Sequence, residues 1–194
     1  VEAKETEDDF NITMNEIIRG IEFAANNESV PVVSCKITGM ARFSLLEKIS
    51  QGETLLVAEE EEFRNVRKRV ESICHVANKY KVALFFDAEE SWIQAAIDGL
   101  VEDMMQLYNK EQAIVYATYQ MYRHDRLQYL VDSFSKSSMN GYILGAKLVR
   151  GAYMEKERKR AEWLGYASPI QPNKKATDED FDKAVQFCLS NHEY

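Results

Sequence analysis

The sequence contains few of the residues that build metal sites, disulfide frameworks and flexible linkers. Its 194 residues include three cysteines, three histidines, three prolines and eight glycines. Cys35, Cys74 and Cys188 are odd in number and far apart in the chain, so we expect reduced thiols rather than a disulfide framework. So few scattered histidines also argue against a metal site, and we expect no bound metal.

Long apolar runs, basic patches and nucleotide-binding glycine motifs are absent as well. Because no run of about 18 apolar residues occurs, no transmembrane helix is predicted. The first residues, VEAKETEDDF, lack the apolar core of a signal peptide. A net charge of −8 without a Lys/Arg-dense face argues against nucleic acid as a partner. The sequence has neither G-x-G-x-x-G nor G-x-x-x-x-G-K-[ST], which argues against Rossmann and P-loop nucleotide sites.

What is present is an alternation of short apolar runs with helix-periodic segments. The apolar runs predict strands at 30–37, 81–87, 113–117 and 142–149. Helical periodicity predicts helices at 10–25, 59–80, 90–108, 123–134, 155–164 and 178–189. The last three strands start near 82, 113 and 144, at a constant spacing of 31 residues. One strand with a returning helix needs about 30 residues, so the pattern predicts a tandem βα repeat and a parallel sheet.

The repeat fits two architectures, an open doubly wound sheet and a (β/α)8 barrel. A complete barrel of eight such units needs about 250 residues, more than this chain has. The first predicted helix has no strand before it, and the last has no strand after it. We therefore expect a piece of a larger α/β domain.

Charged residues stand at the C-terminal ends of the predicted strands, where both architectures bind ligands. Lys36 and Asp87 follow the first and second strands, and Lys147 and Arg150 lie in and after the fourth. Such charges are costly beside buried strands unless they are paired or face a polar cavity. One explanation is a structural Lys36–Asp87 ion pair. The other is a site for an anionic substrate or an electron-rich cofactor.

The segments around these residues resemble the motifs of the proline dehydrogenase (proline oxidase) family. They are KLVRGAY at 147–153, DAEESWIQ at 87–94, Thr118-Tyr119-Gln120 and the 169–172 stretch PIQP. Their order and spacing match the family over essentially the whole chain. The resemblance implies that residues 1–194 are a fragment of a single catalytic (β/α)8 TIM-like barrel, about strands two to five with their helices, incomplete at both ends.

The resemblance also implies an activity. The family holds FAD at the strand C-termini, oxidises L-proline to Δ1-pyrroline-5-carboxylate and passes the electrons to a membrane quinone. It implies a cytoplasmic enzyme at the inner face of a bacterial membrane, with peripheral membrane association of the full-length protein, or a mitochondrial one in a eukaryote. Two alternatives remain, a hydroxyproline dehydrogenase and a barrel enzyme that uses Lys36 as a Schiff-base amine.

The resemblance assigns roles to nine positions of this sequence. Lys36 is expected to bind the substrate carboxylate, and Asp87 to organise Lys36 and the pocket. Lys147 is expected beside the reactive flavin N5 edge, and Tyr153 in the proline pocket. Cofactor contacts are expected from Lys147 and from Ala88, Val149, Arg150 and Gly151. Ala117 stands where the family usually has Asn or Gln, so an amide contact to the flavin is either missing or supplied by another residue.

A last expectation concerns the 194-residue chain by itself. Unpaired edges of a parallel sheet recruit other chains, and open apolar faces associate. We therefore expect this chain alone to self-associate, to lack stoichiometric FAD and to be inactive.

Overall fold

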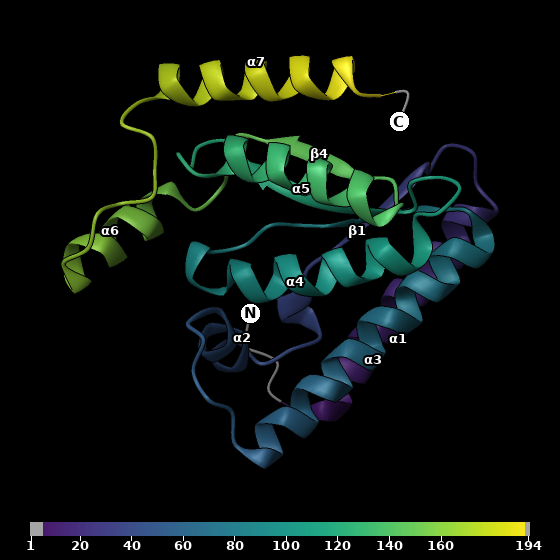
Figure 1. Ribbon diagram of the computed structural model, residues 1–194. Helices are drawn as coiled ribbons and strands as arrows, with labels where there is room; N and C mark the ends of the chain where they lie inside the picture. The colour runs from purple at the N-terminus through teal and green to yellow at the C-terminus, as the bar shows by residue number, and fades with distance from the viewer. Residues whose placement is uncertain (1–5, 193–194) are drawn as a thin grey trace.

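Four parallel strands form one sheet in the computed structural model, which describes residues 6–192 (Figure 1). The strands are β1 (Val32–Cys35), β2 (Ala83–Phe86), β3 (Val115–Gln120) and β4 (Ala146–Val149), in the spatial order β1-β2-β3-β4. Each strand pairs in parallel with the next in sequence. This order confirms the parallel βα repeat that the 31-residue spacing predicts.

Seven α-helices and one short 3-10 helix connect and flank the described strands. They are α1 (Glu7–Ala25), η1 (Ile37–Gly39), α2 (Phe43–Ser50), α3 (Val57–Tyr80), α4 (Ser91–Tyr108), α5 (Arg126–Asn140), α6 (Met154–Leu164) and α7 (Lys174–Ser190). Local chemistry fixes their ends. The Thr6 side chain accepts a hydrogen bond from the Asp9 amide at the start of α1, and Gly141, with a φ of 63°, ends α5 in the left-handed conformation.

The hydrophobic core lies between the sheet and the helices that cover one of its faces. Leu84, Phe86 and Val115 are at most 1% exposed and belong to this core. Their neighbours in the strands, Phe85 and Tyr116, are only partly buried, because alternate side chains of a strand point to opposite faces. The sheet therefore has one helix-covered face and one more open face.

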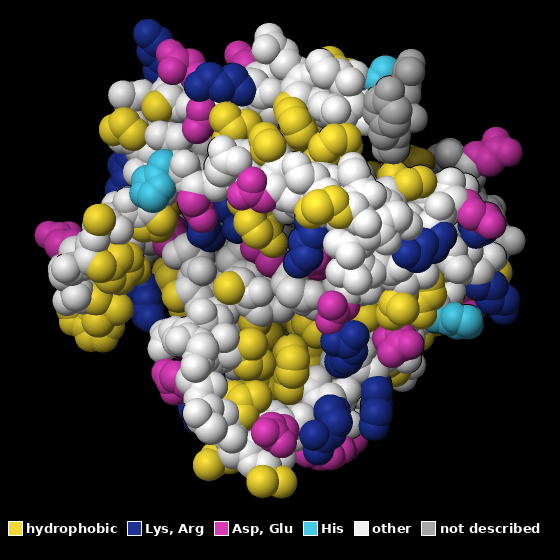
Figure 2. All heavy atoms as spheres, viewed as in Figure 1, with side chains coloured by type: hydrophobic (Ala, Val, Ile, Leu, Met, Phe, Trp, Pro, Cys, Tyr) yellow, Lys and Arg dark blue, Asp and Glu magenta, His cyan; other side chains and the backbone are white. Residues whose placement is uncertain are grey.

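The helix-covered side carries charges of both signs. On the face formed by α4, α5 and α7, Lys and Arg side chains alternate with Asp and Glu, and hydrophobic atoms show between the helices (Figure 2). Within residues 6–192, no helix combines the length and apolar character needed to cross a membrane.

Several elements differ from the sequence prediction. The short helix η1 was not predicted, β4 begins at Ala146 and not at residue 142, and α5 runs to Asn140 and not to residue 134. Two further differences have a clear physical cause. Helix α2 was not predicted; its eight residues begin after Arg42 without a side-chain cap, and it is held by burial of Leu45 and Leu46 against its neighbours. Strand β3 extends to Gln120 instead of ending at residue 117. It continues because residues 118–120 pair with residues 147–149 of β4. The buried Thr118 hydroxyl donates to the Phe86 carbonyl oxygen at 2.7 Å, so a polar side chain is accommodated inside the sheet.

Candidate active site

An ion pair joins two strand ends on the open face of the sheet. Lys147 Nζ in β4 lies 2.7 Å from Asp87 Oδ1, directly after β2, and both side chains are 29% exposed. The Asp87 amide donates to the Cys35 carbonyl oxygen at 2.9 Å, which continues the β1–β2 pairing past the end of β2. The Lys147 ammonium also lies 5.8 Å from the centre of the Phe85 ring. The sheet thus holds a carboxylate and a cation in fixed positions beside partly open space.

Lys36 and Tyr153 form a second contact beside this pair. Lys36, exposed at the start of η1, donates from Nζ to the Tyr153 hydroxyl at 3.2 Å. The hydrogen bond to Tyr153 raises the pKa of the Lys36 amine, while partial burial opposes the rise. Tyr153 immediately precedes α6, so the start of that helix faces the end of β1. The amine is therefore held in its charged form, suited to a carboxylate.

Of the two explanations offered for these charges, the structural Lys36–Asp87 ion pair is wrong. Asp87 pairs with Lys147, and Lys36 contacts Tyr153 instead. The physical reason is the register of the sheet, which sets Lys147 opposite Thr118 and brings its side chain over β2. Spacing along the chain places several charges at the same edge but does not decide which of them pair.

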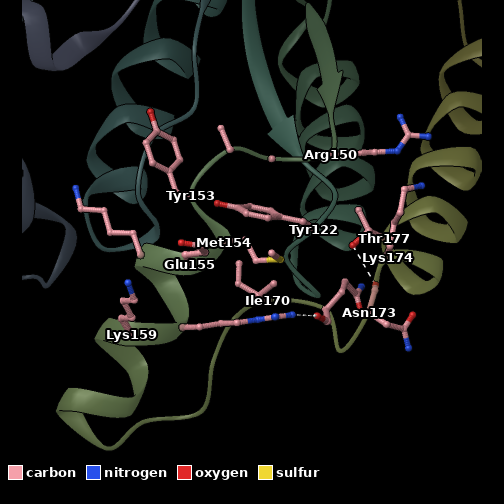
Figure 3. Close-up of a pocket in the computed structure, with 15 residues that line it drawn as sticks. Tyr122, Arg150, Tyr153, Met154, Glu155, Lys159, Ile170, Asn173, Lys174 and Thr177 are labelled. Carbon is pink, nitrogen blue, oxygen red and sulfur yellow. Dashed lines mark hydrogen bonds between the residues drawn. The ribbon is translucent and has the colours of Figure 1, made fainter.

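Arg150 and Val149 lie at the end of β4, as expected, but the Arg150 side chain points away from Lys147. Arg150 Nε lies 2.6 Å from Asp178 Oδ1, and the guanidinium lies 4.2 Å from the centre of the Phe181 ring. Both partners belong to α7, toward which the Arg150 side chain points in Figure 3. Arg150 thus fastens α7 to the strand end.

A cavity of about 800 Å³ opens next to these residues, between the end of β4, the start of α6 and the start of α7 (Figure 3). Tyr122 and Gly151 form part of its wall. Gly151 has a φ of 129°, and a Cβ built on it lies 2.3 Å from Tyr122 Cδ1, so only glycine fits there. Five cations and one carboxylate line the wall: Arg150, Lys156, Arg158, Lys159 and Lys174, with Glu155. Three of these cations pair with carboxylates beside the cavity, Arg150 and Lys174 with Asp178 and Lys156 with Glu90. Cations still outnumber carboxylates, which favours an anionic group in the cavity.

The two alanines expected at the cofactor are placed differently from the charged residues. Ala88 follows Asp87 and is 9% exposed. Ala117 is 7% exposed, pairs in register with Phe86 and belongs to the core between sheet and helices. The structure thus groups Lys36, Asp87, Lys147 and Tyr153 at the open strand ends, and does not bring the Ala117 side chain to them.

The fold and this geometry define a class: an α/β chain whose ligand site lies at the carboxyl ends of parallel strands. The comparisons with known proteins then give the family. The family model described as "Proline dehydrogenase" matches residues 1–194, and the chain belongs to that family. This confirms the family prediction made from the motifs.

Relatives and a solved structure agree with this assignment. The chain is 39% identical to proline dehydrogenase 1, mitochondrial, of Drosophila melanogaster over 131 residues, 68% of this chain but 19% of that protein. It is 33% identical to the hydroxyproline dehydrogenase of Xenopus laevis over 147 residues, 75% of this chain and 32% of that protein. The crystal structure of proline utilization A from Bdellovibrio bacteriovorus, inactivated by N-propargylglycine, superimposes with a TM-score of 0.83 at 16% identity, covering 100% of this chain and 21% of that one. The fold is therefore part of a TIM-like barrel, as predicted.

Several residues around the site were missed by the sequence prediction. The cavity cations Lys156 and Lys159 lie on a helix that was predicted only as a closing element, and Lys174 lies before the predicted helix 178–189, because α7 begins four residues earlier. Glu89 and Glu157 are buried and bind partners 51 and 66 residues away, Thr38 and Ser91. The DAEES segment that contains Glu89 carries the available signal, because two adjacent acidic residues directly after a buried strand require partners.

Proposed function

We propose that this chain is part of a single catalytic barrel domain that oxidises L-proline to Δ1-pyrroline-5-carboxylate with FAD. The observation that carries the proposal is the convergence of Lys36, Asp87, Lys147 and Tyr153 at the open ends of β1, β2 and β4. In the reaction, the ring nitrogen loses a proton and the adjacent ring carbon remote from the carboxylate loses a hydride. Proline thus gives up two electrons and gains a C=N bond.

Lys36 binds the proline carboxylate in this proposal. Its ammonium is exposed, and the bond to Tyr153 fixes its direction. Tyr153 forms one wall of the substrate pocket, since its ring lies against the Lys36 ammonium at 5.8 Å. A substrate held by its carboxylate presents the same ring carbon to the acceptor in each turnover, which is the entropic part of catalysis.

Lys147 supplies positive charge where the acceptor gains electrons. FAD, when bound, supplies the two-electron acceptor for the hydride. The Asp87 carboxylate holds Lys147 Nζ at 2.7 Å and so fixes the position of this charge. A preorganised cation stabilises developing negative charge without rearrangement during the reaction.

The residues present fit FAD. Its diphosphate is an anion, and the cavity beside Gly151 is lined by five cations and one carboxylate. The Gly151 backbone lies against the Tyr122 ring with no room for a side chain, so these two residues form a closely packed part of the cavity wall. The residues that would hold the cofactor are Lys147 together with Ala88, Val149, Arg150 and Gly151. Ala117 is not among them, because its side chain lies in the core and its amide donates to the Gly145 carbonyl oxygen at 2.9 Å.

Gly151→Ala tests this placement of the cofactor. A Cβ at residue 151 collides with the Tyr122 ring and strains a φ of 129°. We expect the full-length variant to lose about 10-fold or more in FAD affinity, because shifting the β4 end displaces the cavity wall. Flavin absorbance per protein after dialysis measures the loss. Gly52→Ala, which also has a positive φ but an open surrounding, is the matched control; equal flavin loss in both variants would contradict the placement.

The electrons are proposed to pass from the flavin to a quinone, with peripheral membrane association of the full-length protein. The Drosophila relative is named mitochondrial. By analogy, we propose a mitochondrial location if the source is a eukaryote, and a cytoplasmic one at the inner face of the membrane if it is a bacterium.

One alternative substrate has support. The Xenopus relative is named hydroxyproline dehydrogenase, so hydroxyproline is the second candidate. The Schiff-base alternative is disfavoured, since the raised pKa of Lys36 keeps its amine protonated and not nucleophilic.

The decisive experiment uses the purified full-length protein. Anaerobic mixing with L-proline is expected to bleach the flavin band and yield one equivalent of Δ1-pyrroline-5-carboxylate. Faster bleaching by hydroxyproline would select the second candidate. A lysine adduct trapped by borohydride, without flavin bleaching, would overturn the proposal.

The 194-residue chain alone is proposed to self-associate and to be inactive. In the described sheet, β1 and β4 each have a strand neighbour on one side, and Phe85 and Tyr116 on the open face are only partly covered. We expect sedimentation velocity to give dimers or larger species, with little flavin absorbance. A stable monomer with stoichiometric flavin would contradict both expectations.

A further inference from the structure

We propose that Glu89 is the positioning residue for Lys36, acting through a pair of hydrogen bonds that fix the turn in which Lys36 lies. This inference rests on the proposed role of Lys36 in binding the substrate carboxylate. Glu89 is 3% exposed and lies two residues after Asp87. Its carboxylate points across the sheet from the end of β2 to η1, which directly follows β1.

Both carboxylate oxygens of Glu89 are engaged by a single residue. The Thr38 amide donates to Oε1 at 3.1 Å, and the Thr38 hydroxyl donates to Oε2 at 2.6 Å. Lys36 is the residue immediately before η1, whose three residues are centred on Thr38. A bidentate contact restricts rotation of that turn, and therefore the direction in which the Lys36 side chain leaves the chain.

The backbone of Glu89 is itself held from two other elements. Its amide donates to Gln94 Oε1 at 2.7 Å, in the first turn of α4. Its carbonyl oxygen accepts from Gln120 Nε2 at 2.8 Å, at the end of β3. Glu89 therefore connects the ends of β1, β2 and β3. Because its backbone is held from α4 and β3, Glu89 cannot move with Thr38 if the turn at Thr38 shifts.

The charge of Glu89 is consistent with this function. Burial raises the pKa of its carboxyl, and the two Thr38 hydrogen bonds and the Lys36 charge oppose that rise. A buried carboxyl group that lacks hydrogen-bond partners is costly, so Glu89 imposes the matching geometry on Thr38. The same contacts predict that an amide can replace the carboxylate: the Oε1 atom of glutamine accepts from the Thr38 amide, and its Nε2 donates to the Thr38 hydroxyl.

Three variants of the full-length enzyme test the inference. Glu89→Ala removes both hydrogen bonds, and Thr38→Val removes only the hydroxyl bond at nearly the same volume. Glu89→Gln keeps both bonds. We expect Glu89→Ala to raise the KM for proline about 10-fold or more, and Thr38→Val to raise it about 3-fold. The kcat per bound flavin should change much less, because the contact of Lys36 with the proline carboxylate acts in the ground state and the transition state alike. Glu89→Gln is expected to restore the KM to within about 3-fold of the parent.

Glu59→Ala is the matched structural control. Glu59 is also buried, and it accepts from the Leu56 amide at 2.9 Å and from Lys48 at 2.7 Å, at the start of α3. We expect it to lower the melting temperature with an unchanged KM per bound flavin. If Glu89→Ala and Thr38→Val also lower only the melting temperature, or if Glu89→Gln raises the KM as much as Glu89→Ala, the positioning role is refuted. Failure of the proposed function differs visibly, since the parent enzyme itself would then not be reduced by proline.

Discussion

Replacing Lys147 with methionine in the full-length enzyme is expected to slow flavin reduction by proline about 100- to 1000-fold, while proline binding changes far less. The reason is the position of the Lys147 ammonium, which Asp87 holds at 2.7 Å at the open end of the sheet. Removing one preorganised group that stabilises developing charge costs about this factor in other enzymes. Stopped-flow absorbance under anaerobic conditions separates the reduction rate at saturating proline from the apparent dissociation constant.

Two further variants make this result specific to the site. Lys147→Arg keeps a cation and is expected to recover most of the rate. Lys183→Met removes an exposed lysine that lies 3.1 Å from Asp180 on the surface of α7, and it is expected to leave the rate unchanged. An unaltered reduction rate in Lys147→Met would remove Lys147 from the mechanism and leave its ion pair a structural feature.

The parts of the fold that were predictable from sequence are those with a regular signal. The constant spacing of strand starts specifies neighbouring parallel strands, because one helix crossing needs a fixed length of chain. Helix α2 has no comparable signal. Its eight residues are too few to show periodicity, and its start after Arg42 has no capping side chain, so its stability depends on tertiary packing of Leu45 and Leu46.

The site was predictable as a group of residues but not as a set of contacts. Strand ends place Lys36, Asp87 and Lys147 at one edge whatever the exact register, so their convergence follows from topology. Which charges pair depends on register and side-chain direction, which local sequence does not specify. The contact of Glu89 with Thr38 is likewise visible only in three dimensions, although an acidic residue in a buried segment indicates that some partner must exist.

Asp87→Ala is expected to impair both steps at once, raising the proline dissociation constant and lowering the flavin reduction rate about 10-fold each. Without the carboxylate, the Lys147 ammonium loses its partner at 2.7 Å and is no longer held in one position. The positive charges of Lys36 and Lys147 then remain near the same strand ends without the carboxylate between them. Lys36 also loses the negative charge of Asp87, which favours its protonated form. Asp87→Asn keeps the shape and one acceptor oxygen, so its losses of proline affinity and of flavin reduction rate are expected to be smaller than those of Asp87→Ala.

A double-mutant cycle decides whether Asp87 acts through Lys147. If the pair works as a unit, Asp87→Ala has little left to remove once Lys147 is methionine, so the double variant should reduce flavin about as slowly as Lys147→Met alone. The residual effect of Asp87→Ala in the methionine background then measures its separate contribution to proline binding. Fully additive losses in the reduction rate would contradict joint action of Asp87 and Lys147 and would assign Asp87 an independent role at the substrate. If neither Asp87→Ala nor Asp87→Asn lowers the reduction rate or weakens proline binding, the ion pair is only a structural contact between β2 and β4.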